Sequence, residues 1–333
     1  MSENKKILVI NFGGIGDEIL FLPTLKSLKT TYPDCKITLA LEARSKSIKD
    51  LTDTIDDMIL LSPKSKNKYV EMLKLIYNAR KGHYDIVISS GGNKFIPILL
   101  FLTGIKKRYG FNTGKLSKIF LTESVTLNKN QYASKMYHDL ITPITDVKNE
   151  IPEISVPQTE KIPNSILIHP GVSKISVQKN MIKTITPQIW TDVIKILLNN
   201  GKHVTLTGGP DDKDVIEQIL HSISPLNKPN FENCYGKTKN LMDLAILISK
   251  YEKFICSDSA PLHIGVGVKT RTYVIFGSTD NKKLVPECDY VTVLKTNDDC
   301  PIKPCLWEHR QTTCQELKCL QFRADDIANE VLK

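Results

Sequence analysis

Apolar residues in this chain follow two patterns that alternate along the sequence. Short continuous apolar runs, such as residues 6–11 and 165–169, are typical of buried parallel strands. Other stretches, such as 15–30 and 187–200, carry apolar residues every three or four positions and predict amphipathic helices. Strands that alternate with helices in this way indicate α/β domains built on parallel sheets.

The alternation continues on both sides of one interruption. Residues 145–164 contain three prolines and show little helical periodicity, as expected for a linker. We therefore expect two doubly wound domains, residues 1–150 and 164–322, joined by a linker at 151–163 and followed by a terminal helix within 323–333. The other predicted strands are 37–41, 84–88, 203–207, 254–256 and 272–277, and the other predicted helices are 69–79, 132–144, 212–223 and 241–251.

Composition narrows the class of protein. The chain has 333 residues, which is long for one hydrophobic core, and its 41% hydrophobic and 24% charged residues are typical of a globular protein. No apolar run approaches the roughly 20 residues that cross a bilayer. The first residues lead into a strand without a signal-peptide pattern, so we expect a cytoplasmic protein. The net charge of +9 suits an acidic substrate or an anionic lipid surface, and the lack of a nucleic-acid-binding motif makes nucleic acid an unexpected partner.

The most informative motif follows the apolar run 254–256. Its residues are Asp258, Ser259, Ala260, Pro261, Leu262 and His263. A strand that leads into a helix start presents free backbone N–H groups, which favour an anion. A second turn, Gly277-Ser278, ends the next predicted strand, so the pair of turns predicts a diphosphate site. The alternative is that Asp258 and Ser259 only cap a helix.

A second candidate follows the first strand. Gly14-Ile15-Gly16 suggests a dinucleotide-binding turn, with Glu42 at the end of the second strand, but Ile19 occupies the third glycine position. The same turn places Asp17 in the first turn of a helix. That carboxylate can complement the helix dipole, or it can act as a general base.

In this order, the motifs resemble those of the family 9 glycosyltransferases, the heptosyltransferases of lipopolysaccharide assembly. The resemblance runs from Gly14–Asp17 through Ile168–Gly171 and Gly208–Asp211 to the Asp258 and Gly277 motifs. It implies a GT-B architecture, two Rossmann-like domains that face each other across a cleft. It also implies inverting transfer from a nucleotide-diphospho-sugar, ADP-heptose in typical members, to an anionic glycolipid or oligosaccharide of the lipopolysaccharide core. No metal cofactor is implied.

The resemblance also assigns roles to residues. Asp17 falls on the catalytic carboxylate, and the terminal helix is expected to pack back toward the N-terminal domain. Lys183 is expected to meet the diphosphate, with Lys179 as a rival. The expected donor-binding residues are Gly16, His169, Gly171, Lys183, Thr207, Gly208, Gly209, Asp258, Ser259, Ala260, Pro261, Leu262, His263, Gly277 and Ser278.

Three positions depart from the family pattern. Ala260 stands where glycine is usual, Ile185 where tryptophan is common, and Glu18 where an apolar residue is often found. These differences leave open a transferase with another nucleotide sugar or a non-catalytic relative that binds one. The glycine turn also leaves open an NAD-dependent oxidoreductase.

Four cysteines form a separate cluster near the C-terminus. Cys300, Cys305, Cys314 and Cys319 have the spacing C-x4-C-x8-C-x4-C, which is looser than the usual zinc knuckle. A zinc site, reduced thiols in the core and disulfides are the three alternatives, and a cytoplasmic location favours reduced thiols.

The lysine-containing loops at 91–94 and 106–115 suit an anionic saccharide acceptor.

Overall fold

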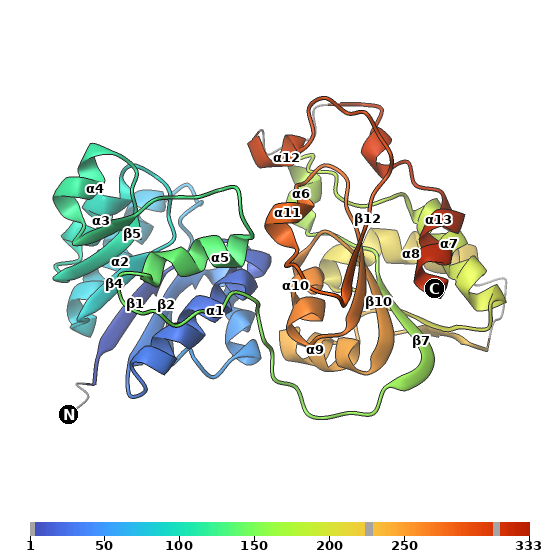
Figure 1. Cartoon of the computed structure of the whole chain (residues 1–333), viewed down its shortest axis with the longest axis horizontal. Helices are drawn as coiled ribbons and strands as arrows, with labels where there is room; N and C mark the ends of the chain where they lie inside the picture. Colours follow the sequence, from blue (N-terminus) through green and yellow to red (C-terminus); the bar gives the residue numbers. More distant parts are fainter. Residues whose placement is uncertain (1–3, 224–228, 309–313) are drawn as a thin grey trace. The chain divides into compact units, whose positions relative to one another are not determined.

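The computed structural model describes residues 4–223, 229–308 and 314–333. The chain divides into two compact units, Met1–Glu153 and Ile154–Lys333, which are described separately below (Figure 1). The second unit thus begins within the expected linker, and its first strand starts at Ile162.

The described part of the first unit contains a six-stranded parallel sheet with the order β3-β2-β1-β4-β5-β6. The central strand β1 pairs with β2 and β4, and four of its five residues are buried, which explains its continuous apolar sequence. The strands are β1 Lys6–Ile10, β2 Lys36–Glu42, β3 Asp57–Leu61, β4 Ile86–Ser89, β5 Lys107–Phe111 and β6 Glu123–Val125.

Helices cover this sheet and connect its strands. α1 packs against α5, whereas α2 and α3 contribute Leu75, Ala79 and Leu100 to a core cluster with sheet residues such as Leu8 and Val87. The helices are α1 Ile15–Thr31, α2 Lys68–Gly82, α3 Ile96–Leu102, α4 Lys115–Phe120 and α5 Ala133–His138. The helix predicted at 132–144 is shorter, because a 3-10 turn, Asp139–Ile141, follows α5.

The described part of the second unit contains another six-stranded parallel sheet, ordered β12-β11-β10-β7-β8-β9. Its strands are β7 Ile162–His169, β8 His203–Leu206, β9 Phe231–Asn233, β10 Tyr251–Ser257, β11 Arg271–Ile275 and β12 Val291–Leu294. Both sheets therefore have the same order, third-second-first-fourth-fifth-sixth, which is the doubly wound arrangement. The predicted pair of α/β domains is confirmed.

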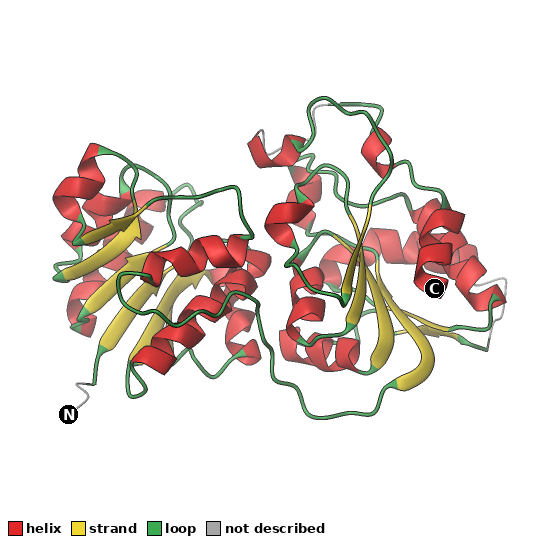
Figure 2. Cartoon of the chain, viewed as in Figure 1, coloured by secondary structure: helices red, strands yellow, loops and turns green. Residues whose placement is uncertain are grey.

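Figure 2 shows helices on both sides of the second sheet. They are α6 Lys174–Gln178, α7 Pro187–Asn199, α8 Lys213–Ile223, α9 Leu241–Ser249, α10 Ala260–Gly267, α11 Asn281–Leu284, α12 Cys305–Glu308 and α13 Ala324–Leu332. α13 packs against α7, and its Ile327, Ala328 and Val331 join the core around Trp190 (Figure 1). The terminal helix therefore belongs to the core of the second unit, and its expected packing toward the N-terminal domain stays a prediction.

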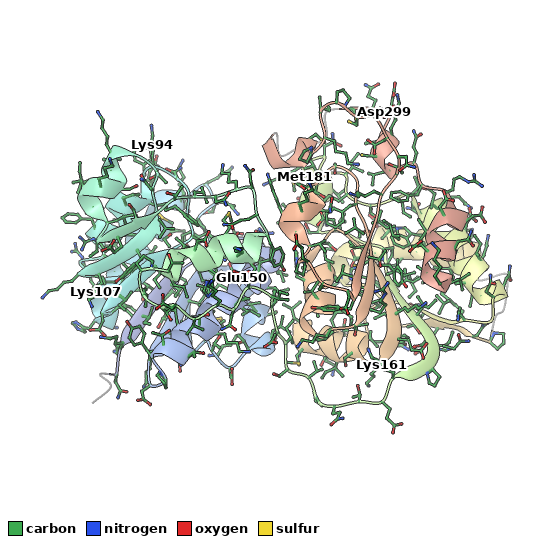
Figure 3. The ribbon with its side chains drawn as sticks, in the orientation of Figure 1. Lys94, Lys107, Glu150, Lys161, Met181 and Asp299 are labelled. Carbon is green, nitrogen blue, oxygen red and sulfur yellow. The ribbon has the colours of Figure 1, made fainter. Side chains whose placement is uncertain are left out.

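The strands of each sheet run in one direction, so their carboxyl ends share one edge. In the second unit, Figure 3 shows Lys161, just before β7, at the opposite end of the sheet from Met181 and Asp299. Ligands of doubly wound sheets bind at the carboxyl edge. No helix in the described part of the chain is long and apolar enough to cross a membrane.

Candidate active site

The turn after β10 leads directly into α10. Ser259 is the N-cap residue, yet its side chain makes no capping hydrogen bond, and its hydroxyl lies 3.4 Å from the Gly171 carbonyl oxygen that it donates to. The first turn of a helix leaves N–H groups without helical partners, and here they point to the carboxyl edge of the sheet. The simple capping interpretation of Asp258 and Ser259 is therefore wrong.

Asp258 instead forms a buried ion pair. Its Oδ2 lies 3.2 Å from Lys183 Nζ, and Thr279 Oγ1 donates a hydrogen bond of 2.6 Å to the same oxygen. The Asp258 side chain is 3% exposed and that of Lys183 is 21% exposed. Lys179 is exposed at the end of α6. The structure therefore brings Lys183, and not Lys179, to the predicted diphosphate turn.

The loop that carries Lys183 is fixed on both sides of the lysine. Ser278 Oγ donates a hydrogen bond of 2.6 Å to the Ile182 carbonyl, and Ser257 Oγ bonds to Thr184 Oγ1 at 2.7 Å. Ser278 follows β11, and Ser257 ends the neighbouring strand β10. Because each neighbour of the lysine is tied to a strand end, the ammonium group is held at the carboxyl edge of the sheet.

A second group of polar residues lies where β7 and β8 end. His169 Nε2 is 3.5 Å from Asp212 Oδ2, and the same oxygen accepts a 2.8 Å hydrogen bond from the Gly209 N–H. Burial lowers the pKa of His169 and raises that of Asp212, and the attraction between the two groups opposes both shifts. Within the described residues, His169 Nδ1 and Thr207 Oγ1 are buried without a hydrogen-bond partner. Buried polar groups are usually satisfied, so these two atoms can each form a hydrogen bond to a polar ligand at the strand ends.

Close contacts require glycine at two positions of the candidate site. We call the residues that end or follow β7 and β8, His169–Gly171 and Thr207–Asp212, the cradle. A Cβ atom on Gly171 would lie 1.7 Å from Asp212 Oδ1, and one on Gly277 would lie 2.5 Å from Leu320 Cδ2. The backbone after β7 can therefore approach the Asp212 carboxylate only without a side chain.

The predicted donor-binding residues of the second unit thus gather at one edge of its sheet. Those that end or follow its strands are His169, Gly171, Thr207, Gly208, Gly209, Asp258, Ser259, Ala260, Gly277 and Ser278. Pro261, Leu262 and His263 lie within α10 and have buried side chains. Gly16 belongs to the first unit.

In the first unit, Asp17 is held by a hydrogen bond to each carboxylate oxygen. Gly14 N–H donates to Oδ2 at 2.8 Å, and the Tyr137 hydroxyl donates to Oδ1 at 3.1 Å. Burial and the nearby Asp17 charge raise the pKa of Tyr137 well above its ordinary value, so the phenol remains protonated and donates. Asp17 therefore both caps α1 and is oriented by α5.

Glu18, next to Asp17, is a buried carboxyl group. It is 1% exposed, and its Oε2 accepts a 3.0 Å hydrogen bond from Asn11 Nδ2. Burial, followed by repulsion from Asp17, raises its pKa well above the ordinary value. Glu42, which belongs to the dinucleotide-binding interpretation of the glycine turn, forms ion pairs with Arg44 and Lys64.

Several of these partners had no recognisable sequence signal. Tyr137 lies in a short helix far along the chain from Asp17, and the Thr184 hydroxyl resembles any surface threonine in the sequence. Asp212 had a partial signal, because it follows the turn that begins at Gly208.

The cysteine cluster packs beside the second turn. Cys305 Sγ lies 3.8 Å from the Ser278 carbonyl oxygen, and burial raises the pKa of Cys319 to about 11. None of the four cysteines forms a disulfide with another described residue, and the described residues contain no group of three or more His, Cys, Asp or Glu that could hold a metal. A cavity of about 960 Å³ lies beside this segment, lined mainly by residues 292–302 and 314–330.

Comparison with solved structures identifies the fold of this chain. Among solved structures, E. coli ADP-heptose lps heptosyltransferase II superposes with a TM-score of 0.74 at 17% identity, covering 98% of this chain and 97% of that one. E. coli heptosyltransferase WaaC with ADP-2-deoxy-2-fluoro heptose gives a TM-score of 0.73 at 14% identity, covering 98% and 99%. The fold is therefore that of the GT-B enzymes, with two Rossmann-like domains.

The sequence comparisons go further. The family model described as glycosyltransferase family 9 (heptosyltransferase) matches residues 72–314. Lipopolysaccharide heptosyltransferase 3 of Escherichia coli is 26% identical over 280 residues, which cover 80% of this chain and 82% of the relative. The chain therefore belongs to glycosyltransferase family 9 and is a glycosyltransferase, which decides against the NAD-dependent oxidoreductase.

Proposed function

We propose that this chain transfers heptose, with inversion, from ADP-heptose to a glycan acceptor of the lipopolysaccharide core or a related anionic saccharide. The reaction would occur in the cytoplasm at the inner face of the membrane, without a metal cofactor. The similarity to a lipopolysaccharide heptosyltransferase of E. coli supports the acceptor class, and the ADP-2-deoxy-2-fluoro heptose in the WaaC structure supports the donor.

The observation that carries the proposal is the ion pair at the start of α10. Lys183 and the N–H groups of Ser259 and Ala260 lie at the carboxyl edge of the sheet. Together they can stabilise the negative charge of a departing nucleoside diphosphate. Asp258 and Thr279 orient the lysine, and Asp258 moderates its charge until a diphosphate enters.

The remaining polar groups of the cradle suit the rest of the donor. Thr207 Oγ1 and His169 Nδ1 are buried polar atoms without partners in the described residues, and each is available for a hydrogen bond to the nucleotide. Selection of ADP over another nucleoside diphosphate would depend on these strand-end groups.

Asp17 would act as the general base. As the acceptor hydroxyl oxygen attacks the anomeric carbon, the bond from that carbon to the diphosphate breaks, and the hydroxyl proton passes to the Asp17 carboxylate. ADP leaves with the bonding electron pair, and a single displacement inverts the anomeric configuration. The Gly14 N–H and Tyr137 hydroxyl keep the carboxylate in one orientation, which is what proton transfer at a fixed position requires.

The first test separates donor binding from transfer. Calorimetric titration in the presence of a chelator should show binding of ADP and ADP-heptose in preference to UDP-sugars. Lys183→Met should weaken ADP binding by about tenfold or more, since it removes a charge-assisted contact, whereas the exposed control Lys179→Met should not. Binding of only a UDP-sugar would discard ADP-heptose as the donor.

The second test addresses the base. Asp17→Asn keeps the size of the side chain but cannot accept the proton, so release of ADP in the presence of acceptor should fall by about 100-fold or more. ADP affinity should be nearly unchanged, because in this proposal Asp17 accepts the proton of the acceptor and the contacts to the diphosphate come from Lys183 and the start of α10. Near-normal transfer by Asp17→Asn would refute the proposed mechanism.

A further inference from the structure

Positive charge is concentrated in one segment of the first unit. Residues 64–120 contain twelve lysines and arginines and two acidic residues, a net charge of +10 against +9 for the whole chain. One of the two acids, Glu71, is buried, paired with Lys74 and bonded to the Ser62 N–H. The surface formed by this segment is therefore strongly cationic, and the rest of the chain is nearly neutral.

Helix α2, in this segment, has two apolar stripes. Leu75 and Ala79 are buried against the sheet. Tyr69, Leu73 and Tyr77 recur every four residues and are 74%, 65% and 65% exposed. The two stripes are offset by two positions, about 200° around a helix, so they lie on opposite sides of α2. The outward side of this helix is therefore apolar where a surface helix is normally polar.

The apolar surface continues onto the neighbouring helices. α2 contacts α3 and α3 contacts α4, and Arg80 Nε donates a 3.0 Å hydrogen bond from α2 to the Leu102 carbonyl at the end of α3. The Phe101 and Phe120 rings of α3 and α4 lie 5.1 Å apart. We call this surface the α2–α4 face. Its exposed apolar residues are Tyr69, Val70, Leu73, Tyr77, Phe95, Phe101, Leu102 and Ile119.

Basic side chains are interleaved with these aromatic rings. Lys68 Nζ lies 5.1 Å from the centre of the Tyr69 ring, and Lys94 Nζ lies 5.2 Å from that of Phe95. Figure 3 shows Lys94 and Lys107 extending outward from the first unit. The face thus combines large apolar groups that can enter a lipid interface with cations that can reach phosphate groups.

We propose that the α2–α4 face docks on the anionic phospholipid surface of a membrane. Exposed aromatic and leucine side chains with flanking lysines are the combination that binds such a surface, because apolar burial and attraction to anionic lipid act together. The composition disfavours the other occupants. Protein interfaces are depleted in lysine, and a second copy of this chain would place two strongly cationic faces together.

The proposal rests on the proposed function only in the reason for docking, which is an acceptor joined to a lipid. Docking itself needs neither donor nor acceptor. Vesicle binding can therefore be measured on the free enzyme, and its failure is separable from a failure of the transfer assay.

The experiment is flotation of the full chain with vesicles of phosphatidylcholine, with and without phosphatidylglycerol. The wild-type protein should bind the anionic vesicles more tightly than the neutral ones, and less tightly as salt is raised. The double variant Leu73→Gln, Tyr77→Gln should lose about tenfold or more in partitioning. Ile302→Gln replaces an exposed apolar residue of the second unit and is the matched control.

Two further measurements make the outcome decisive. Circular dichroism should show an unchanged fold in the double variant, and transfer to a water-soluble acceptor fragment should stay at the wild-type rate. Lys68→Gln, Lys118→Gln should reduce binding to anionic vesicles only. Wild-type vesicle binding by the Leu73, Tyr77 variant would overturn the proposal, as would a dimer in sedimentation that this variant dissociates.

Discussion

The ion pair between Lys183 and Asp258 is expected to stabilise the second unit as well as to prepare it for a diphosphate. Lys183→Met keeps an unbranched side chain and removes the charge. It leaves the nearly buried Asp258 carboxylate with the Thr279 hydroxyl and no ammonium group at 3.2 Å.

The size of the effect follows from the geometry. Two unit charges 3.2 Å apart attract by about 5 kcal/mol at an effective dielectric constant of about 20. Desolvation of both groups offsets part of this, and the 21% exposure of the Lys183 side chain allows water to screen the pair. We expect Lys183→Met to lower the free energy of unfolding by about 3 kcal/mol, the lower end of the range for a broken buried pair.

The two tryptophans make the assay specific to this unit. Trp190 and Trp307 both lie in the second unit, and Trp190 is fully buried, so urea unfolding followed by tryptophan fluorescence reports on its core. The double variant Lys183→Met, Asp258→Asn should lose less than the sum of the single variants, because it leaves no charge buried alone. Lys179→Met, at an exposed position, should change stability by less than about 0.5 kcal/mol.

Additive single and double variants would refute this account of the pair. So would a Lys183→Met variant as stable as Lys179→Met, since the attraction would then be fully screened by water.

Two other substitutions test the environments of the candidate site. Burial and Asp17 raise the pKa of Glu18, so its ionisation destabilises the fold as pH rises from the ordinary pKa near 4.5 through the raised pKa. Glu18→Gln should therefore gain stability relative to the wild-type protein over that pH range and match it at lower pH. Thermal melts followed by circular dichroism measure the difference. Gly171→Ala would place Cβ 1.7 Å from Asp212 Oδ1 and should cost about 2 kcal/mol or more in fluorescence-detected unfolding. Gly209→Ala is its control, because the Cβ would lie 3.8 Å from Asp212 Oδ2, and an equal loss in both variants would contradict the steric explanation.

The central strands were predictable because both of their faces are buried. β1, β7 and β10 read as continuous apolar runs, and the structure places each within a few residues of its predicted position. The four edge strands β3, β6, β9 and β12 and the inner strand β5 were not predicted. The edge strands are short and only partly buried, so their sequences carry little apolar signal. β5 begins with two basic residues and contains a glycine, so it has no continuous apolar run.

The terminal helix shows the limit of a periodic pattern. Residues 324–332 form the predicted helix, and its apolar stripe is buried as expected. Periodicity indicates that a helix has a face to bury but does not identify the surface that covers it. In the structure that surface is α7 of the same unit.

The site was predictable to the level of strand ends. Parallel strands bring their carboxyl ends to one edge, so motifs at Gly171, Gly209 and Asp258 could be expected to meet there. Contacts between distant segments could not be expected. The Tyr137 hydroxyl reaches Asp17 only because α5 packs against α1, and no local pattern in either segment encodes that contact.

The identical strand order of the two sheets has an evolutionary consequence. The turn after the first strand of each sheet carries a different function in our proposal: Asp17 follows β1, whereas the His169–Gly171 cradle follows β7. Asp17 and the His169–Gly171 cradle thus occupy equivalent positions in two sheets of the same strand order, and separate halves of the gene encode them. Mutation can then alter the recognition of one substrate without disturbing the scaffold that recognises the other, so donor and acceptor preferences are free to diversify independently.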